Sequence, residues 1–175
     1  MKKSVKYTIR EAYSKEFNEL GKLMVSVYSQ IEGFPSKAKI PGYYEVLNNI
    51  GLLSEKSESK LLVAVSSENE LLGGVVYFGR MEHYGVATNE DRTSGIRFLA
   101  VNSSARGMGI GRALTETCIK IAKNKNHSQV ILHTTDAMPI ARRLYEKMGF
   151  KRSSDLDFEK QKFMVYGFRL KITST

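Results

Sequence analysis

The sequence predicts a single α/β domain in which a mixed sheet of six or seven strands is flanked by about four helices. The chain has 175 residues, 42% of them hydrophobic, which is enough for one domain with an ordinary buried core. Short apolar runs with the periodicity of strands alternate with longer segments of helical spacing. A glycine-rich stretch at residues 107–111 lies between such a strand and such a helix. With no repeat or linker in the sequence, we treat residues 1–175 as one domain.

The first third of the chain predicts one strand followed by two helices. Residues 4–12 alternate apolar and polar side chains, which favours a half-buried strand. Residues 13–28 carry apolar side chains at helical spacing and predict a helix. Glycines and prolines indicate a loop at residues 29–44, and residues 43–53 predict a second, short helix.

The middle of the chain predicts three strands. Residues 60–66 and 71–81 are apolar runs, and the short polar segment 67–70 connects them in the manner of a hairpin. Residues 82–95 are polar and predict an irregular excursion. The third strand of this group is expected at residues 96–101.

The last third predicts helices and strands in alternation. A helix follows the glycines and ends near Asn124, a strand of the buried type covers residues 129–135, and a helix covers residues 138–150. Residues 163–172 predict the last strand. A short additional strand at residues 150–154 is the element that would raise the number of strands from six to seven.

The composition argues against metal sites, membrane spans and secretion. The single cysteine, Cys118, excludes an internal disulfide, and the three histidines lack metal-ligand spacing, so no metal is expected. No stretch approaches the roughly 18 apolar residues that a membrane span needs. The first residues lack the apolar core of a secretory signal, so we expect a cytoplasmic protein without a membrane partner.

The formal net charge of +9 is compatible with nucleic acid, an anionic membrane surface or an anionic small ligand as partner. The densest basic clusters, residues 120–127 and 159–163, are not interleaved with aromatic residues as a base-stacking surface requires. We therefore expect no nucleic-acid partner. A phosphate-bearing cofactor accounts for part of the positive charge, and solvated helix faces account for the rest.

Gly107, Gly109 and Gly111 stand between a predicted strand and a predicted helix, directly after Arg106. Glycine lets the backbone adopt unusual dihedral angles and approach a ligand closely. The free N–H groups and the dipole at the start of the next helix favour an anion there. The stretch therefore predicts a phosphate site, in particular for a pyrophosphate. The alternative is a tight turn that binds nothing.

Two known phosphate loops do not fit this stretch. The Walker pattern ends in Gly-Lys-Ser/Thr, whereas this chain has Arg112 and Ala113 after Gly111. The dinucleotide fingerprint G-x-G-x-x-G would need glycine in place of Arg112. It also needs an acidic residue about 20 positions later, where residues 126–132 offer none.

The stretch instead resembles the Q/R-x-x-G-x-G/A motif of the GNAT superfamily of acyl-CoA-dependent N-acyltransferases, with Arg106, Gly109 and Gly111 at the defined positions. The predicted strand order agrees with that family over residues 6–172, and the resemblance implies a mixed, mostly antiparallel sheet. A second family signature, A-x-x-L-Y-x-x-x-G-F, follows after one intervening strand. It is met by Ala141, Leu144, Tyr145, Gly149 and Phe150.

The resemblance implies acetyl-CoA, or another acyl-CoA, as donor and a primary amine of a small molecule or peptide as acceptor. It places the pantetheine arm along residues 99–101, where adjacent strands splay apart and leave backbone groups free to bind it. One N–H group there, at Val101 or its neighbour, would face the thioester carbonyl. Many members carry an asparagine where this chain has Met138, so that contact with the cofactor is in question. The implied cofactor-binding residues are Leu99, Ala100, Val101, Arg106, Gly107, Met108, Gly109, Ile110, Gly111, Arg112, Ala141 and Tyr145.

The resemblance also makes Tyr145 the general acid that protonates the departing thiolate. A phenol has a reference pKa near 10 and a thiol near 8.5, so the tyrosine is protonated at neutral pH and can donate. By spacing alone, Tyr145 belongs to the buried stripe of an amphipathic helix. The base that accepts the amine proton stays open. Glu82 is the tentative choice for this base, and His83, the next residue, is also placed to serve. Asp136 is either a rival base or the N-cap of the next helix. His133 fits a core histidine better, and water is a further route.

The acceptor pocket is expected between the loop at residues 31–44 and the polar segment at residues 83–95. Phe34, Tyr43 and Tyr44 either line this pocket or pack the first helices onto the sheet. We hypothesise an N-acetyltransferase that works by direct attack in a ternary complex. The alternative is a non-catalytic module that binds acyl-CoA as a regulatory ligand. The sequence does not decide whether the protein forms a homodimer.

Overall fold

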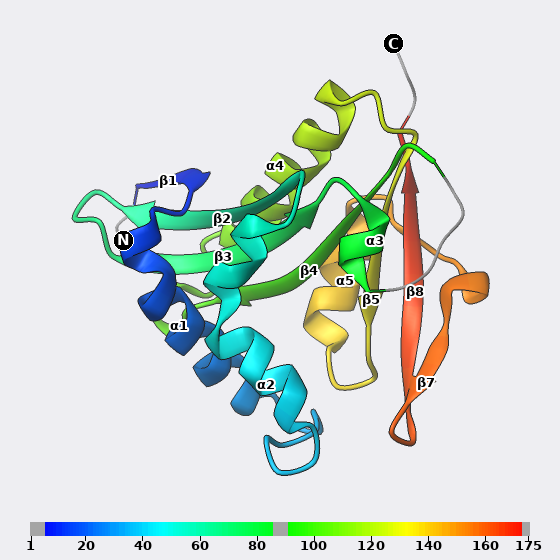
Figure 1. The fold of residues 1–175 in the computed structure, drawn as a ribbon, viewed down its shortest axis with the longest axis horizontal. Coiled ribbons are helices and arrows are strands. Elements are labelled where there is room, and N and C mark those ends of the chain that lie inside the picture. Colours follow the sequence, from blue (N-terminus) through cyan, green and yellow to red (C-terminus); the bar gives the residue numbers. More distant parts are fainter. Residues whose placement is uncertain (1–5, 86–90, 173–175) are drawn as a thin grey trace.

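The computed structural model describes residues 6–85 and 91–172, and these form the mixed α/β sheet with flanking helices that the sequence predicts. The strands lie in the order β1-β2-β3-β4-β5-β8-β6, with β7 paired to β8 outside this path, and the sheet has eight strands (Figure 1). Among the described strands, β4 and β5 are the parallel pair and every other pair is antiparallel. The strands are β1 (Tyr7–Glu11), β2 (Ser59–Ser66), β3 (Leu71–Phe78), β4 (Thr93–Val101), β5 (Gln129–Thr134), β6 (Lys151–Arg152), β7 (Phe158–Lys160) and β8 (Phe163–Lys171).

Helices cover both faces of the sheet and create two hydrophobic cores (Figure 1). The first core lies under α1 and α2 and includes the fully buried Leu20 and Met24. The second lies under α4 and α5 and includes Leu114 and Cys118. The helices are α1 (Phe17–Ser29), α2 (Pro41–Asn48), α3 (Met81–Tyr84), α4 (Ile110–Asn124) and α5 (Pro139–Lys147), and short 3-10 turns occur at Ser14–Glu16, Ile50–Glu55, Ser103–Ala105 and Ser154–Leu156.

Strands β3, β4 and β7 differ from the expected pattern. Strand β3 ends at Phe78 and not at Met81, because Met81 begins the short helix α3. Strand β4 begins three residues earlier than expected, at Thr93, because the polar side chain of Ser94 is buried with its hydroxyl satisfied. The Ser94 Oγ lies 2.7 Å from the Tyr77 hydroxyl and 2.7 Å from His127 Nδ1. Strand β7 is an addition to the expected set. Its turn to β8 consists of Gln161 and Lys162, both with positive φ, and neither is a residue that signals such a turn.

Strands β4 and β5 diverge after a short parallel stretch. Their register runs from Thr93 opposite Gln129 to Ile96 opposite Leu132, after which β4 pairs with β3 alone. In that later part, Gly74 opposes Ala100 and Val76 opposes Arg97, so β4 holds one residue more than β3. The extra residue is a β-bulge in which Phe98 has a φ of 59°.

The bulge reverses the side-chain alternation of β4. Ile96 packs in the core under α4 and α5, whereas Phe98, two residues later, packs in the core under α1 and α2. Leu99 and Val101 again face the α4 side. A regular strand would place Ile96 and Phe98 on the same face. The bulge therefore moves the even-numbered residues of β4 from the α4 face of the sheet, where Ile96 lies, to the α1 face, where Phe98 and Ala100 lie.

Helix α5 ends in a Schellman motif that holds Tyr145 in place. The Phe150 N–H donates to the Tyr145 carbonyl at 3.0 Å, and the Gly149 N–H donates to the Glu146 carbonyl at 3.1 Å. Gly149 has a φ of 97°, a conformation that costs a residue with a side chain roughly 1–2 kcal/mol. The Phe150 ring packs against Tyr145 with centroids 5.8 Å apart.

We expect Gly149→Ala to lower the free energy of unfolding by about 1 kcal/mol, because the left-handed conformation is strained for alanine. Gly42→Ala is the matched control, since Gly42 lies in α2 and a methyl group there meets no atom within 4 Å. That variant should be neutral or slightly stabilising. Urea denaturation measures both, and equal stabilities of the two variants would contradict the prediction.

Candidate active site at the divergence of β4 and β5

The glycine stretch forms a loop that leads into the first turn of α4. Gly107 has a φ of 78° and Gly109 a φ of 79°, so two of the three glycines adopt the left-handed conformation. Gly111 lies beside α5, since a methyl group built on it would meet the Leu144 side chain at 3.5 Å, an ordinary van der Waals distance. The loop thus brings the start of α4 against α5.

The backbone of this loop offers a run of hydrogen-bond donors. The first bond of α4 joins the Ala113 N–H to the Gly109 carbonyl at 3.0 Å. Within residues 6–85 and 91–172, the N–H groups from Gly107 through Arg112 donate to no protein acceptor. These donors and the positive end of the 15-residue helix α4 form an anion-binding arrangement.

Side chains anchor the loop and add positive charge to it. Ile110 is buried in the second core, and Met108 packs against the same core. Arg106 is exposed, and no carboxylate of the described chain pairs with it. Arg112 is also exposed, but its Nε lies 2.9 Å from Glu116 Oε1, which offsets its charge. Arg106 is therefore the free cation of this loop within the described part of the chain.

The end of β4 leaves polar backbone groups without a strand partner. From Arg97 to Val101, the β4 edge that faces β5 has no paired strand in the described chain, since the register between them stops at Ile96. Across the gap, the hydroxyls of Thr134 and Thr135 are buried and find no partner in the part of the protein that the structure describes. Buried polar groups are normally paired, so this gap is suited to a polar ligand.

Tyr145 lies in α5 with 6% of its surface exposed, within the second core, where Ala141 also packs. Burial raises the pKa of Tyr145 well above its usual value, and the nearby Cys118 thiol adds to this rise. The hydroxyl therefore stays protonated at neutral pH. No hydrogen-bond partner for it is found among the described residues.

The Tyr145 hydroxyl is electrostatically coupled to tyrosines from the opposite face of the sheet. The pKa of Tyr28 in α1 is raised well above its usual value by burial first, then by Tyr43 and Tyr145. The pKa of Tyr84 in α3 is raised mainly by burial, against a lowering by Arg97, with a further rise from Tyr145. Tyr145, in the second core, is therefore near enough to Tyr28 and Tyr84, in the first core, to raise the pKa of both.

Aromatic rings from α1, α2 and β4 form a cluster on the α1 side of the gap. The ring centroids of Tyr28 and Phe34 are 5.4 Å apart, and those of Tyr43 and Phe98 are 5.6 Å apart. Burial, the dominant cause, raises the pKa of Tyr43 to about 12. Tyr44 is 2% exposed and donates to the Pro35 carbonyl at 2.9 Å, so it is a packing residue. Phe34 and Tyr43 are partly buried beside the gap.

His133 is bound through both ring nitrogens. Its Nε2 lies 2.9 Å from the Leu156 carbonyl, so Nε2 carries the hydrogen, and Nδ1 accepts from the Tyr84 hydroxyl at 2.7 Å. Burial is the first cause that lowers the pKa of His133, which keeps the ring neutral at pH 7. His133 is therefore a satisfied histidine that fixes the orientation of Tyr84.

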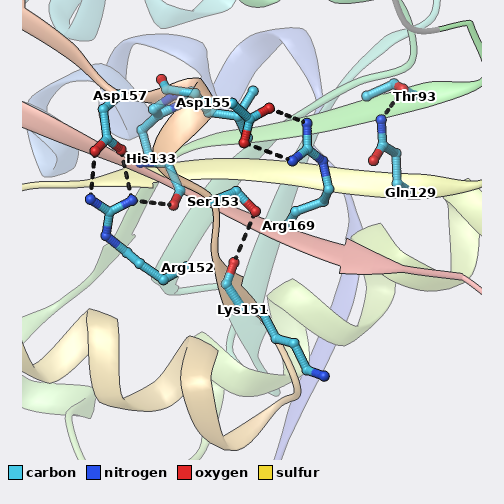
Figure 2. A network of polar contacts seen from close by, with 11 residues as sticks. Thr93, Gln129, His133, Lys151, Arg152, Ser153, Asp155, Asp157 and Arg169 are labelled. Carbon is cyan, nitrogen blue, oxygen red and sulfur yellow. Dashed lines mark hydrogen bonds and ion pairs between the residues drawn. The ribbon is translucent and has the colours of Figure 1, made fainter.

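A polar network holds the Leu156 carbonyl in this position. Figure 2 shows Arg152 bound to Asp157 by two bonds, at 2.7 and 2.5 Å, beside His133. Asp157 also accepts from the Gly167 N–H at 2.8 Å, and the bond to Arg152 chiefly lowers the pKa of this carboxyl group. In the same view, Arg169 pairs with Asp155. These bonds tie the segment between β6 and β7 to β8.

The other candidate bases lie at the surface. Glu82 is exposed on α3, its Oε1 lies 2.7 Å from Arg80 Nε, and Glu82 as base stays a prediction. His83 Nε2 lies 3.1 Å from the Ser57 hydroxyl. Asp136 is exposed and accepts from the Tyr166 hydroxyl at 3.2 Å. The expectation that Asp136 caps the next helix is wrong, because the N-cap residue is Met138, whose side chain packs against the first core.

Three residues of this site escaped the sequence analysis: Tyr28, Tyr84 and Arg97. Tyr28 ends a predicted helix, where its spacing indicates only a packing role. Tyr84 lies in a polar segment, for which the sequence predicts no binding role. Arg97 carried a usable signal, because it is the one charged residue in the apolar strand at residues 96–101. No group of three or more potential metal ligands occurs within the described residues. Nor does any helix in the described ranges have the length and apolar character needed to cross a bilayer.

A sheet that opens beside a glycine-lined helix start, with a buried tyrosine on the adjacent helix, is the arrangement that the sequence motifs predict for the N-acyltransferase class of fold. The model of the Acetyltransferase (GNAT) family matches residues 23–150. The chain therefore belongs to the GNAT acetyltransferase family, as its motifs predict.

Relatives and solved structures agree with this assignment. A segment of 68 residues is 38% identical to N-acetylaspartate synthetase of Danio rerio and covers 39% of this chain and 24% of that protein. A segment of 55 residues is 42% identical to N-acetyltransferase 8B of Mus musculus and covers 31% of this chain and 24% of that protein. The chain thus matches about a quarter of the length of these relatives.

Two structures show the same fold along almost the whole chain. The GNAT-family acetyltransferase from Staphylococcus aureus Mu50 superposes with a TM-score of 0.75 at 18% identity, over 96% of this chain and 100% of that one. The PaiA N-acetyltransferase from Thermoplasma acidophilum, solved in complex with coenzyme A, gives a TM-score of 0.71 at 16% identity, over 93% of this chain and 98% of that one. At these identities the likeness establishes the fold.

Proposed function

We propose that this protein is an N-acetyltransferase that transfers the acetyl group of acetyl-CoA to a primary amine by direct attack within a ternary complex. The observation that carries the proposal is the placement of two features at one gap in the sheet. One is the run of unbonded N–H groups from Gly107 through Arg112, and the other is the buried, protonated Tyr145. Gly111 lies next to Leu144, the neighbour of Tyr145 in the sequence, which supports the placement of these features side by side.

The residues at the gap suit coenzyme A. The N–H groups of the glycine loop and the guanidinium of Arg106 would bind the phosphates. The unpaired edge of β4 from Leu99 to Val101 would bind the amide groups of the pantetheine arm, as the family resemblance implies. Met138 supplies no side-chain hydrogen bond where many members have asparagine, so this chain relies on its backbone there.

We expect Arg106→Ala to weaken coenzyme A binding about five- to tenfold, because the variant removes the free cation of the loop. Arg112→Ala is the matched comparison and should weaken binding less than about threefold, since Glu116 already offsets this charge. Isothermal titration calorimetry measures both affinities. Folded wild-type protein that gives no heat with millimolar coenzyme A would overturn the whole proposal.

Bound acetyl-CoA would supply an acyl carbon that an amine can attack and a sulfur that can leave. A C–N bond forms as the C–S bond breaks, the nitrogen gives up one proton, and the sulfur gains one. Tyr145 would donate the proton to sulfur, which its raised pKa permits, because the phenol is protonated when the reaction begins. A backbone N–H at the end of β4 would stabilise the negative charge that grows on the carbonyl oxygen.

Tyr145→Phe should lower kcat at least about 100-fold and leave the Kd of coenzyme A within about twofold. The phenyl ring keeps the packing against Phe150, and the lost hydroxyl has no partner in the described chain, so stability should change little. Tyr13→Phe, at an exposed tyrosine, is the control. A fully active Tyr145→Phe enzyme would remove the proton-donor role, and wild-type protein that binds coenzyme A but acetylates no amine would favour a regulatory module.

The amine must lose its proton before it attacks, and we propose that water takes it. Glu82, the tentative base, is exposed and paired with Arg80, and no contact joins it to Tyr145 or Arg97 within the described residues. His133 has both nitrogens engaged. Proton transfer to solvent leaves these bonds intact.

Glu82→Gln should therefore change kcat/KM less than about twofold across pH 6 to 9, whereas loss of a general base costs roughly 100-fold or more. The glutamine keeps the shape of the side chain, so folding should be unaffected. Steady-state rates of thiol release over this pH range provide the measurement. A 100-fold loss in Glu82→Gln with normal coenzyme A binding would identify Glu82 as the base after all.

A further inference from the structure

Arg97 is a cation held beside the gap by aromatic rings and one carbonyl. Its Cζ lies 4.4 Å from the centroid of the Phe98 ring and 5.7 Å from that of the Tyr84 ring. Its Nη1 donates to the Tyr84 carbonyl at 2.8 Å. The side chain is partly buried. These contacts fix the position of the guanidinium where β4 leaves β5.

The charge of this guanidinium is not compensated by the protein. In the described chain no carboxylate lies within ion-pair distance of Arg97. The other partly buried arginines of the described residues, Arg10, Arg142 and Arg169, each have a carboxylate partner. A guanidinium has five N–H donors, and one contact to a carbonyl uses one of them. A partly buried charge without a partner is costly, so such a residue usually binds an anion.

The neighbourhood of Arg97 disfavours a second cation. Lys160, on β7, places its Nζ 5.8 Å from the centroid of the Tyr43 ring, and Tyr43 in turn packs on Phe98. Two of the aromatic faces beside the gap are therefore already covered by cations. Burial raises the pKa of Tyr28, Tyr43 and Tyr84, and the charge of Arg97 opposes this rise at each of them. Helices α1, α2 and α3 thus each contribute one tyrosine that is affected by the charge of Arg97.

We propose that the acceptor is an amino acid or another amine bearing a free carboxylate, and that Arg97 binds this carboxylate while the amine faces the gap. This inference rests on the proposed acetyltransferase function and names the class of acceptor. The planar guanidinium can bind both oxygens of a carboxylate at once. Arg97 and the first unpaired residues of β4 adjoin in sequence, so a carboxylate held by Arg97 places the amine of a short amino acid near the β4 edge.

The positive charge would also favour the reactive form of the acceptor. A cation close to an amine stabilises its neutral form relative to its ammonium form. An acceptor whose second group is another ammonium would instead be repelled by Arg97 and Lys160. Diamines and polyamines should therefore be poor acceptors, and an amino acid should be preferred over its carboxamide.

Steady-state assays with matched acceptors test this inference. L-amino acids, their carboxamides and diamines of similar length are compared in the wild-type enzyme and in Arg97→Gln. The wild type should prefer the amino acid over its carboxamide by about 10- to 100-fold in kcat/KM. In Arg97→Gln this ratio should fall to within about threefold of 1, whatever the change in the absolute rates. Lys160→Gln, at an exposed lysine, should reduce the ratio less than about threefold.

A binding measurement separates this inference from the proposed activity. Arginine Nε signals are recorded by NMR on the coenzyme A-loaded protein during titration with the same amino acids and carboxamides. The signal that Arg97→Gln removes should shift with amino acids and stay in place with carboxamides. Acetylation of amines without a preference for carboxylates, or an unmoved Arg97 signal, would overturn the inference and leave the activity intact. Coenzyme A binding without acetylation of any amine would overturn the activity, and the NMR titration would still decide the role of Arg97.

Discussion

The loss of hydrogen bonding between β4 and β5 is the constraint on which the candidate site depends. The parallel register ends where Ile96 faces Leu132, and the bulge at Phe98 then turns the rest of β4. The positive φ of Phe98 has a cost of order 1–3 kcal/mol, which packing of its ring against Tyr43 helps to offset. Were the two strands paired to their ends, the β4 edge would be saturated and side chains from the two cores would be separated by a continuous sheet.

The two faces of the sheet provide different chemistry on either side of this gap. On one side, α4 presents backbone donors and α5 presents Tyr145, an arrangement suited to a phosphate-bearing thioester. On the other side, α1, α2 and α3 contribute tyrosines around Arg97. The anionic groups of donor and acceptor would thus meet separate cations, Arg106 and Arg97. This separation lets two negatively charged molecules occupy neighbouring sites while their reacting atoms approach through the gap.

The sequence was informative where function depends on local backbone chemistry and less so where it depends on tertiary packing. The element order, the glycine loop and the helix that carries Tyr145 followed from periodicity, glycine spacing and motif. The start of β4 at Thr93 did not, because buried hydrogen bonds of Ser94 allow polar residues in a central strand. The bulge at Phe98 could not be predicted either, because no sequence signal indicates a phenylalanine with positive φ. The sequence could not predict that Arg97 lies near residues of three helices, because this proximity arises only when the helices pack on the sheet.

Unsatisfied polar groups provide an independent argument that the gap is a site and not a packing defect. Folded proteins pair nearly all buried polar groups, and a defect would leave isolated exceptions. Here the N–H groups of the loop before α4 and the hydroxyls of Thr134 and Thr135 are unmatched within the described chain. The guanidinium of Arg97 has one hydrogen bond, to the Tyr84 carbonyl, and no carboxylate partner among the described residues. These groups come from separate elements, β4, α4 and the end of β5, yet all of them adjoin the same opening. The Ser59 hydroxyl in β2 is a further buried group without a partner in the described chain, but it stands by itself. Several such groups beside one gap are what selection for ligand binding, against stability, would produce.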